Sequence, residues 1–190
     1  LTAMSDKGCI SDQFILPLSV NPLPVASFDP PAFVCMPNGV ATFTNTSTIA
    51  NGAGLNYAWN FGDPASGSAN TSTDEDGSHV YPDSASYDIT LTVTSAQGCM
   101  HQVTQSFNTF FNKPVAKFGV TPDTLCQGIQ NAFFDTSFAP GSTIETRLWT
   151  FGDGTTDTAV MPTKTYLHPG NYQVNLQVSN AQGCTADVSK

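Results

Sequence analysis

The sequence predicts an all-β fold in which antiparallel β-sandwiches follow one another along the chain. Ser, Thr, Asn and Gly are abundant and only 11% of the residues are charged, a composition that favours strands and turns. Apolar and polar residues alternate along short segments that Gly, Pro and Asn separate, as in half-buried strands. The same order of landmarks occurs twice in 190 residues, which indicates two domains of about half the chain each.

The clearest strands lie late in each repeat. Apolar side chains occupy every second position in residues 87–93 and again in residues 172–178. This alternation places one face of a strand on a core and the other in solvent. Residues 57–61 and 149–151 alternate in the same way. At this density of short strands we expect roughly seven strands per repeat.

The repeat boundaries follow from a gap-free internal alignment. Residues 1–24 align with residues 91–114, and both segments contain a Gly-Cys pair and end in proline. We therefore expect residues 1–24 to be the C-terminal strands of a preceding repeat. Residues 25–112 should form one repeat, and residues 113–190 should form a second whose last strand is truncated.

The five cysteines recur at two positions of the repeat. Cys35 and Cys126 stand early in their repeats, whereas Cys99 and Cys184 belong to the Gly-Cys pair. We expect Cys35 to pair with Cys99, and Cys126 with Cys184 in the same way. Each disulfide would close a loop of about sixty residues, worth roughly 4 kcal/mol in the chain-entropy model. Cys9 would pair within the preceding repeat, and disulfides predict an oxidising, extracellular compartment.

A family resemblance rests on motifs of the second repeat. Trp149-Thr-Phe-Gly-Asp-Gly154 is followed by Tyr166 and by Gly170-Asn-Tyr172-Gln-Val174-Asn-Leu176. This order resembles the polycystic kidney disease (PKD) repeat, and the resemblance implies tandem immunoglobulin-like (PKD) antiparallel β-sandwiches. The first repeat departs from the pattern at Asp63-Pro64 and through a longer insertion that runs to His79.

The ending of the repeat carries a second resemblance. Phe43-Thr-Asn-Thr-Ser47 together with Gly-Cys resembles PKD repeats of large surface proteins in gliding and other Bacteroidetes bacteria. This implies a cell-surface or secreted glycoprotein exported by the type IX route. Ser84, Thr124 and Thr158 stand in Asp-Ser/Thr-apolar triplets that resemble the O-glycosylation acceptors of these bacteria. Ordinary Asp-Ser/Thr turns are the alternative interpretation.

Carboxylates in two places are candidate ligands for calcium, the one cofactor that the sequence brings into consideration. Asp74 and Asp76 lie in the insertion of the first repeat, and Asp153 and Asp157 lie in the second repeat. Neither group has the ligand spacing of an EF-hand loop, so a solvated acidic turn is the alternative. Asp63 and Asp153 each close a strand, where an aspartate commonly caps a turn with its own carboxylate.

Charge and motif content exclude several classes of function. The net charge is −9 with only six Lys and Arg, which argues against nucleic acid or an anionic membrane as a partner. No stretch is long and apolar enough to insert into a bilayer. The three histidines are scattered and no recurring nucleophile or acid accompanies them, so we expect no catalytic residues and no enzymatic activity.

Two functional hypotheses remain. The first is a non-catalytic structural or adhesive protein, in which the repeats form a stalk or surface filament and contact neighbouring repeats, other copies or surface glycans. The second, implied by the family resemblance, is an accessory substrate- or carbohydrate-binding module of a secreted hydrolase. The second needs an exposed aromatic row, for which Phe107, Phe110 and Phe111 are candidates; packing at the junction between repeats is the simpler explanation for them.

Overall fold

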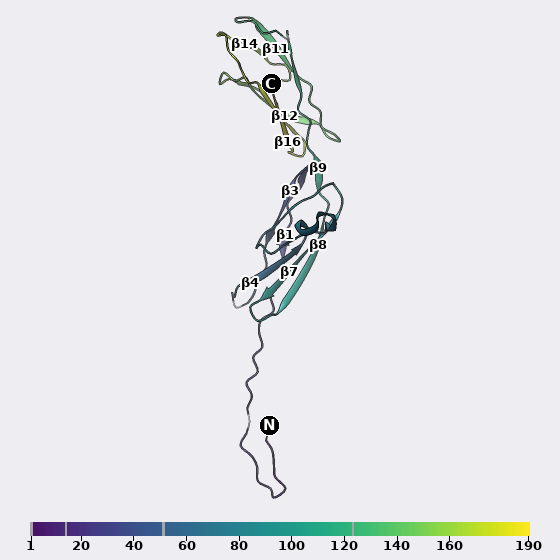
Figure 1. The fold of residues 1–190 in the computed structure, drawn as a ribbon, viewed down its shortest axis with the longest axis vertical. Helices are drawn as coiled ribbons and strands as arrows, with labels where there is room; N and C mark the ends of the chain where they lie inside the picture. Colours follow the sequence, from purple (N-terminus) through teal and green to yellow (C-terminus); the bar gives the residue numbers. More distant parts are fainter. Residues whose placement is uncertain (1, 14, 51, 123) are drawn as a thin grey trace.

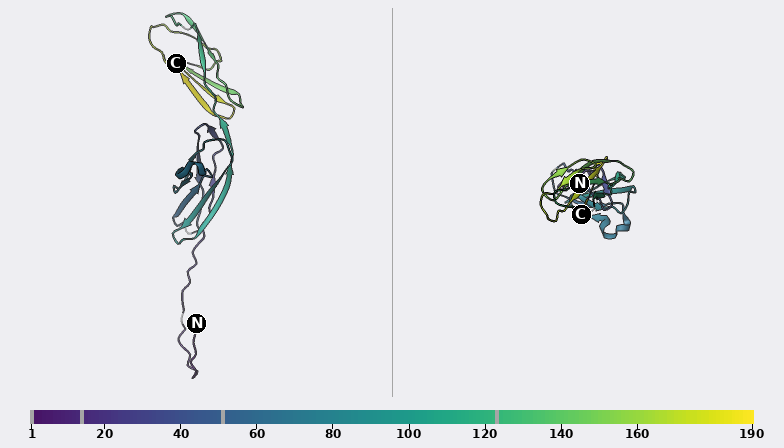
Figure 2. Two further views of the ribbon diagram at one scale, coloured as in Figure 1. Left: turned by 45° about the vertical axis from the view of Figure 1, so that its right-hand side comes forward. Right: turned by 90° about the horizontal axis from the view of Figure 1, so that it is seen from above.

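Two β-sandwiches lie end to end in the computed structural model of the chain (Figure 1). We call residues 25–112 repeat 1 and residues 113–190 repeat 2. The exposed segment that precedes repeat 1 projects from the end opposite repeat 2 in both side views (Figure 2). The structure describes residues 2–13, 15–50, 52–122 and 124–190.

Repeat 1 contains two antiparallel sheets and one short parallel pair. Its strands are β1 (Phe28–Asp29), β2 (Val34–Met36), β3 (Val40–Asn45), β4 (Leu55–Asn60), β5 (Thr71–Ser72), β6 (Gly77–Val80), β7 (Tyr87–Ser95), β8 (Met100–Phe107) and β9 (Phe110–Asn112). One sheet has the order β1-β3-β6 and the other β5-β4-β7-β8, while β2 pairs with β9 in parallel. The insertion forms 3₁₀ turns over Pro64–Asn70.

Repeat 2 has the same two sheets. Its strands are β10 (Phe118–Thr121), β11 (Gln130–Asp135), β12 (Ile144–Thr150), β13 (Thr156–Asp157), β14 (Thr163–Thr165), β15 (Asn175–Asn180) and β16 (Thr185–Ser189). The orders β10-β11-β14 and β13-β12-β15-β16 reproduce those of repeat 1. All of these pairs are antiparallel. The prediction of tandem antiparallel β-sandwiches is confirmed, and no helix of the described residues has the length and apolarity needed to cross a bilayer.

A tryptophan occupies the centre of each core. Trp59 and Trp149 are almost fully buried, and a buried indole N–H needs an acceptor. The Trp59 Nε1–H donates to the carbonyl of Asp74 over 3.0 Å, and the Trp149 Nε1–H donates to the carbonyl of Ala159 over 2.9 Å. The same motif residue therefore fills the core and fixes the same loop in both repeats.

A buried tyrosine in each repeat donates a hydrogen bond to the backbone of the Trp-x-Phe-Gly-Asp motif. The Tyr81 hydroxyl donates to the carbonyl of Phe61 over 2.9 Å, and the Tyr166 hydroxyl donates to the carbonyl of Phe151 over 3.0 Å. Burial raises the pKa of Tyr166, and the charge of the nearby Asp153 adds to the effect. The hydroxyl therefore stays protonated and available as a donor.

Replacing Tyr166 by Phe is expected to lower the free energy of unfolding of repeat 2 by about 1–2 kcal/mol, because the buried Phe151 carbonyl loses its donor. Urea denaturation measures this loss. Tyr172→Phe is the matched control, since its hydroxyl donates to the carbonyl of His168 at an exposed site and its removal should cost less than about 0.5 kcal/mol. Equal losses in the two variants would contradict the assignment.

Candidate functional site at the inter-repeat junction

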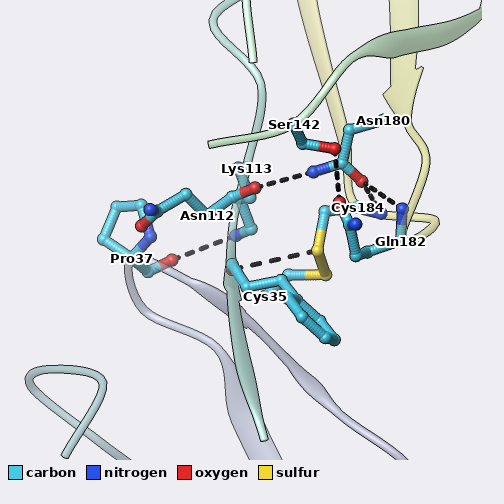
Figure 3. Close-up of a disulfide and its surroundings, with 9 residues drawn as sticks. Cys35, Pro37, Asn112, Lys113, Ser142, Asn180, Gln182 and Cys184 are labelled. Carbon is cyan, nitrogen blue, oxygen red and sulfur yellow. Dashed lines mark hydrogen bonds between the residues drawn. A yellow bond between two sulfur atoms is a disulfide. The ribbon is translucent and has the colours of Figure 1, made fainter. Parts of the chain in front are cut away.

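The disulfide lies between the repeats. Cys35 of repeat 1 is bonded to Cys184 of repeat 2, with 5.6 Å between their Cα atoms and 149 residues between them in the sequence (Figure 3). Cys9, Cys99 and Cys126 are free thiols. The predicted pairs Cys35–Cys99 and Cys126–Cys184 are therefore wrong.

The physical reason is that the two cysteines of repeat 1 lie at opposite ends of the sandwich. Cys35 lies in β2, which with β9 forms the end facing repeat 2 (Figure 1). Cys99 lies in the turn between β7 and β8 at the other end, where the backbone N–H of Ala26 donates to the ring of His101. A disulfide needs Cα atoms within about 7 Å of each other. The number of residues between two cysteines in the sequence does not determine the distance between their Cα atoms in the fold.

The connecting segment is part of repeat 1. Strand β9 runs parallel to β2 with Phe111 opposite Cys35. The backbone N–H of Lys113 donates to the carbonyl of Met36 over 2.7 Å, and its Nζ donates to the carbonyl of Pro37 over 3.1 Å. The backbone therefore remains hydrogen-bonded to repeat 1 as far as the first residue of repeat 2, which shortens the free linker.

Two aromatic residues of this segment, Phe107 and Phe110, pack against the core of repeat 1. Phe107 is buried, and the ring of Phe110 lies 5.0 Å from that of Phe107 and 5.5 Å from that of Tyr81. Phe111 contacts Phe33, with 5.8 Å between the ring centroids. These phenylalanines stabilise the junction end of repeat 1 and do not form an exposed row.

Asn180 holds the turn that presents Cys184. Its Oδ1 accepts the backbone N–H groups of Gln182 and Cys184, at 3.1 and 2.9 Å. Its Nδ2 donates to the carbonyl of Asn112 over 2.9 Å, across the junction (Figure 3). Because Asn180 and Cys184 are both buried, these bonds fix the sulfur of Cys184 beside Cys35. Asn180 stands four residues before Cys184, in the segment Asn-Ala-Gln-Gly-Cys, but the sequence alone did not mark it as a residue of the junction.

Asp153 caps its own turn, as predicted. Its Oδ1 accepts the backbone N–H and the hydroxyl of Thr155, and its Oδ2 lies 2.6 Å from Lys164 Nζ. Hydrogen bonds from Lys164 and then from Thr155 lower the pKa of Asp153 to about 2. Lys164 also lies over the rings of Phe151 and Tyr166, so its charge has both an anion and aromatic faces as partners.

Asp153→Asn is expected to reduce the free energy of unfolding of repeat 2 by less than about 1 kcal/mol at neutral pH, because solvent screens the pair. A lowered pKa means that the contribution is complete above about pH 4 and is lost as the pH falls through about 2. Urea denaturation at pH 7 and at pH 2 measures the difference. A variant that is equally destabilised at both pH values would contradict the ion-pair explanation.

Asp63 occupies the same motif position but has a different partner. Its Oδ2 lies 3.0 Å from Nε2 of His79, while Nδ1 of His79 faces the carbonyl of Ala69 at 3.0 Å. Asp63 and His79 are both buried. Because both ring nitrogens face oxygen acceptors, neither can activate a nucleophile. His79 stands two residues before Tyr81, as Lys164 stands two residues before Tyr166, so in each repeat a nitrogen from this position contacts the motif aspartate.

The calcium candidates do not converge. Asp153 is paired with Lys164. The other three carboxylates each accept a hydrogen bond elsewhere: Asp74 from Ser72, Asp157 from Ala159, and Asp76 from the backbone N–H of Asn45, 31 residues away. Across the described ranges, no three His, Cys, Asp or Glu side chains are placed to hold a metal ion. The acids stabilise turns individually.

The three candidate glycosylation sites lie on the surface. Ser84, Thr124 and Thr158 are exposed and lie outside strands. Asp83 and Asp157 accept the backbone N–H two residues ahead, which is the ordinary Asp turn. Asp123, which precedes Thr124, lies outside the described residues. Modification of these hydroxyl groups stays a prediction.

The comparisons identify the family. The family model described as PKD domain matches residues 21–110 and 112–190. The chain belongs to the PKD domain family. In this PKD pair, the two motif aspartates are held by partners within their own repeats, Asp153 by Thr155 and Lys164 and Asp63 by His79.

One protein and two solved PKD1 domains are each similar to a part of this PKD pair. It is 42% identical over 55 residues to a Vibrio alginolyticus protein named microbial collagenase, which takes in 29% of this chain and 7% of that protein. The PKD1 domain of Vibrio anguillarum Epp is 27% identical, with a TM-score of 0.37, over 41% of this chain and 88% of that domain. The PKD1 domain from the Vibrio cholerae metalloprotease PrtV is 31% identical, with a TM-score of 0.37, over 41% of this chain and 91% of that domain.

Proposed function

We propose that this PKD pair is a stiff, non-catalytic segment of an extracellular stalk or surface filament. The observation that carries the proposal is the disulfide between Cys35 and Cys184, which joins two repeats that each have their own core. A disulfide inside one core would stabilise that core alone. A disulfide between cores restricts their relative motion, which is useful where orientation must be kept over a distance.

Three contacts support the stiffness of the junction. The chain passes from repeat 1 to repeat 2 as a paired strand, the disulfide adds a second covalent connection, and Asn180 bonds to the carbonyl of Asn112. A hinge requires backbone rotation in a free linker, and here the last residues before Pro114 are hydrogen-bonded. The next residue, Pro114, has its own φ fixed by its ring.

The end-to-end arrangement makes length proportional to the number of repeats. The longest strand, β7, has nine residues, and at ~3.4 Å per residue each repeat extends roughly 30 Å. The disulfide fits an extracellular compartment, and the family resemblance favours the cell surface and the type IX route. Its partners would be neighbouring repeats, other copies in a filament or surface glycans, with exposed Ser84, Thr124 and Thr158 as glycan attachment sites.

Electron microscopy of the parent protein, on or released from its cell, tests this proposal. We expect a straight rod with a regular bead along its length, and we expect more bent rods after treatment with a reductant. A compact particle that carries one or two beads beside a large globular body would overturn the stalk proposal.

A second candidate is an accessory module of a secreted hydrolase. It is favoured by the 42% identity over 55 residues to part of a protein named microbial collagenase. The inward packing of Phe107 and Phe110 removes the aromatic row proposed for substrate contact. Co-sedimentation of the chain with insoluble collagen fibrils tests this candidate: retention with the pellet supports it, and recovery in the supernatant contradicts it.

A further inference from the structure

The end of repeat 2 that carries Cys126, here called its outer end, resembles the junction end of repeat 1. In the described residues it lacks a counterpart of strand β9, which pairs with β2 in repeat 1. Cys126 is the counterpart of Cys35 in the order of landmarks and is an exposed thiol. The residue before Cys35, Val34, pairs with Phe110 of β9 and is 2% exposed, whereas the residue before Cys126, Leu125, is 42% exposed. Apolar surface of this kind at a specific position favours a partner that covers it.

A pocket marks the place where this partner would bind. It has a volume of about 430 Å³ and is lined by Cys126, Tyr166 and Tyr172 among others. The two tyrosine rings lie 4.1 Å apart, as do those of Tyr81 and Tyr87 in repeat 1.

In repeat 1, the corresponding tyrosines hold the ring of Phe110 from the connecting strand, at 5.5 Å from Tyr81 and 5.9 Å from Tyr87. The pocket of repeat 2 is therefore lined by the same tyrosine pair that holds the ring of Phe110 in repeat 1.

The opposite end of the molecule carries the complementary cysteine. The backbone N–H of Ser95 donates to the carbonyl of Cys99 over 2.9 Å, as the N–H of Asn180 donates to Cys184 over 3.0 Å. The N–H of the glycine before each cysteine donates to the first residue of the turn over 2.9 Å in both. Cys99 therefore lies on a turn of the same kind as the turn that carries Cys184. Its turn joins β7 to β8, at the end of repeat 1 that faces away from repeat 2 (Figure 1).

The segment before repeat 1 has the features of a connecting strand. Residues 17–24 align without a gap with residues 107–114, and Val20 takes the position of Phe110. Val20 is 87% exposed, although β-branched apolar residues favour buried strands. Both halves of a junction are thus present at the two ends of one chain.

We propose that the outer end of repeat 2 binds a second copy of this PKD pair, joined head to tail on the same polypeptide. Residues 17–24 of the second copy pair with the segment around Cys126, Val20 enters the tyrosine pocket, and Cys126 forms a disulfide with Cys99 of the second copy. Two thiols lose two protons and two electrons as the sulfur–sulfur bond forms. A small-molecule disulfide such as oxidised glutathione accepts both and leaves as two thiols.

This inference goes beyond the proposed function, because a covalently linked array could serve either as a stalk or as a spacer beside an enzyme. The experiment below can therefore contradict the inter-copy disulfide without contradicting the stalk proposal, which electron microscopy tests. Its consequence is that each repeat is bonded to both of its neighbours, so that a reductant acts on every junction of an array.

A fusion of two copies in register tests the proposal. Residues 176–190 align with residues 1–15, so residue 16 of a second copy should follow Lys190 directly. Cys9→Ser and Cys99→Ser in the first copy, with Cys126→Ser in the second, leave one candidate pair besides the two Cys35–Cys184 pairs. After oxidation in glutathione buffer, non-reducing peptide mapping should find Cys126 of the first copy bonded to Cys99 of the second. Free thiols at both positions would overturn the proposal.

A second measurement separates specific docking from chance oxidation. In the same fusion, Val20→Asp in the second copy should slow formation of the disulfide by about tenfold, since a charge cannot enter the tyrosine pocket without a large cost. Leu18→Asp is the matched control, because Leu18 aligns with the polar Asn108 and should leave the rate unchanged. Equal rates in the two variants would show that the pocket does not receive the strand and would overturn that part of the proposal.

Discussion

Replacing Cys184 by Ser is expected to loosen the junction between the repeats and to destabilise repeat 2 by about 4 kcal/mol. The disulfide ties repeat 2 to β2 of repeat 1, so that unfolding repeat 2 in the parent chain leaves a closed loop of roughly 70 residues. The chain-entropy model assigns a loop of this size about 4 kcal/mol. Without the disulfide, the hydrogen bonds of β9 and Asn180 remain, but no covalent bond opposes bending.

Two measurements check the expected result. Urea denaturation gives the loss of stability, and ¹⁵N relaxation reports whether the repeats tumble as one elongated body or as two bodies. Cys126→Ser is the control, because Cys126 is an exposed free thiol. The parent chain under reducing conditions should behave like Cys184→Ser. If the variant keeps a single tumbling time, the disulfide does not determine the stiffness of the junction.

The fold could be predicted because its determinants are local. Alternation marks a half-buried strand, and the structure buries Ile89, Leu91 and Val93 as expected. In repeat 2 it buries Val174, Leu176 and Val178, although β15 begins only at Asn175 and Tyr172 is half-buried. The tryptophan and tyrosine landmarks recur with the same contacts in both cores. Such patterns need no knowledge of which elements meet at long range.

The cysteine pairing could not be predicted because it depends on which end of a sandwich each residue occupies. Pairing within a repeat and pairing with the next repeat both agree with two cysteines per repeat. Pairing within a repeat would leave only Cys9 as a free thiol. Pairing with the next repeat leaves three free thiols in this chain, Cys9, Cys99 and Cys126. Only the direction of the strands, which puts Cys35 and Cys99 at opposite ends, decides between them.

The two motif aspartates show a second limit. Asp63 and Asp153 follow the same Trp-x-Phe-Gly pattern, which predicts a turn cap at both. Asp153 caps its turn and pairs with Lys164, whereas Asp63 is buried with His79. The partner comes from another strand, 16 residues away for Asp63, so the motif alone could not specify it.

Replacing Trp149 by Ala is expected to unfold repeat 2 while repeat 1 stays folded. The side chain is fully buried, and its ring lies 5.2 Å from Phe118 and 6.0 Å from Phe133. Removing a buried tryptophan typically costs about 3–5 kcal/mol through lost burial and the cavity that remains. It also leaves the carbonyl of Ala159 without its indole donor. A domain of this size has a total stability of about 4–12 kcal/mol, so the substitution removes much of it.

Separate cores make this prediction selective. The two buried clusters, from Ala26 to Phe107 and from Phe118 to Val178, share no residue. In Trp149→Ala the amide resonances of repeat 2 should collapse toward random-coil shifts, while those of repeat 1 keep their dispersion. Trp59→Ala should give the converse pattern, which makes each variant the control for the other. Loss of both repeats in either variant would mean that the junction couples the two cores more strongly than the disulfide and the Asn180–Asn112 hydrogen bond imply.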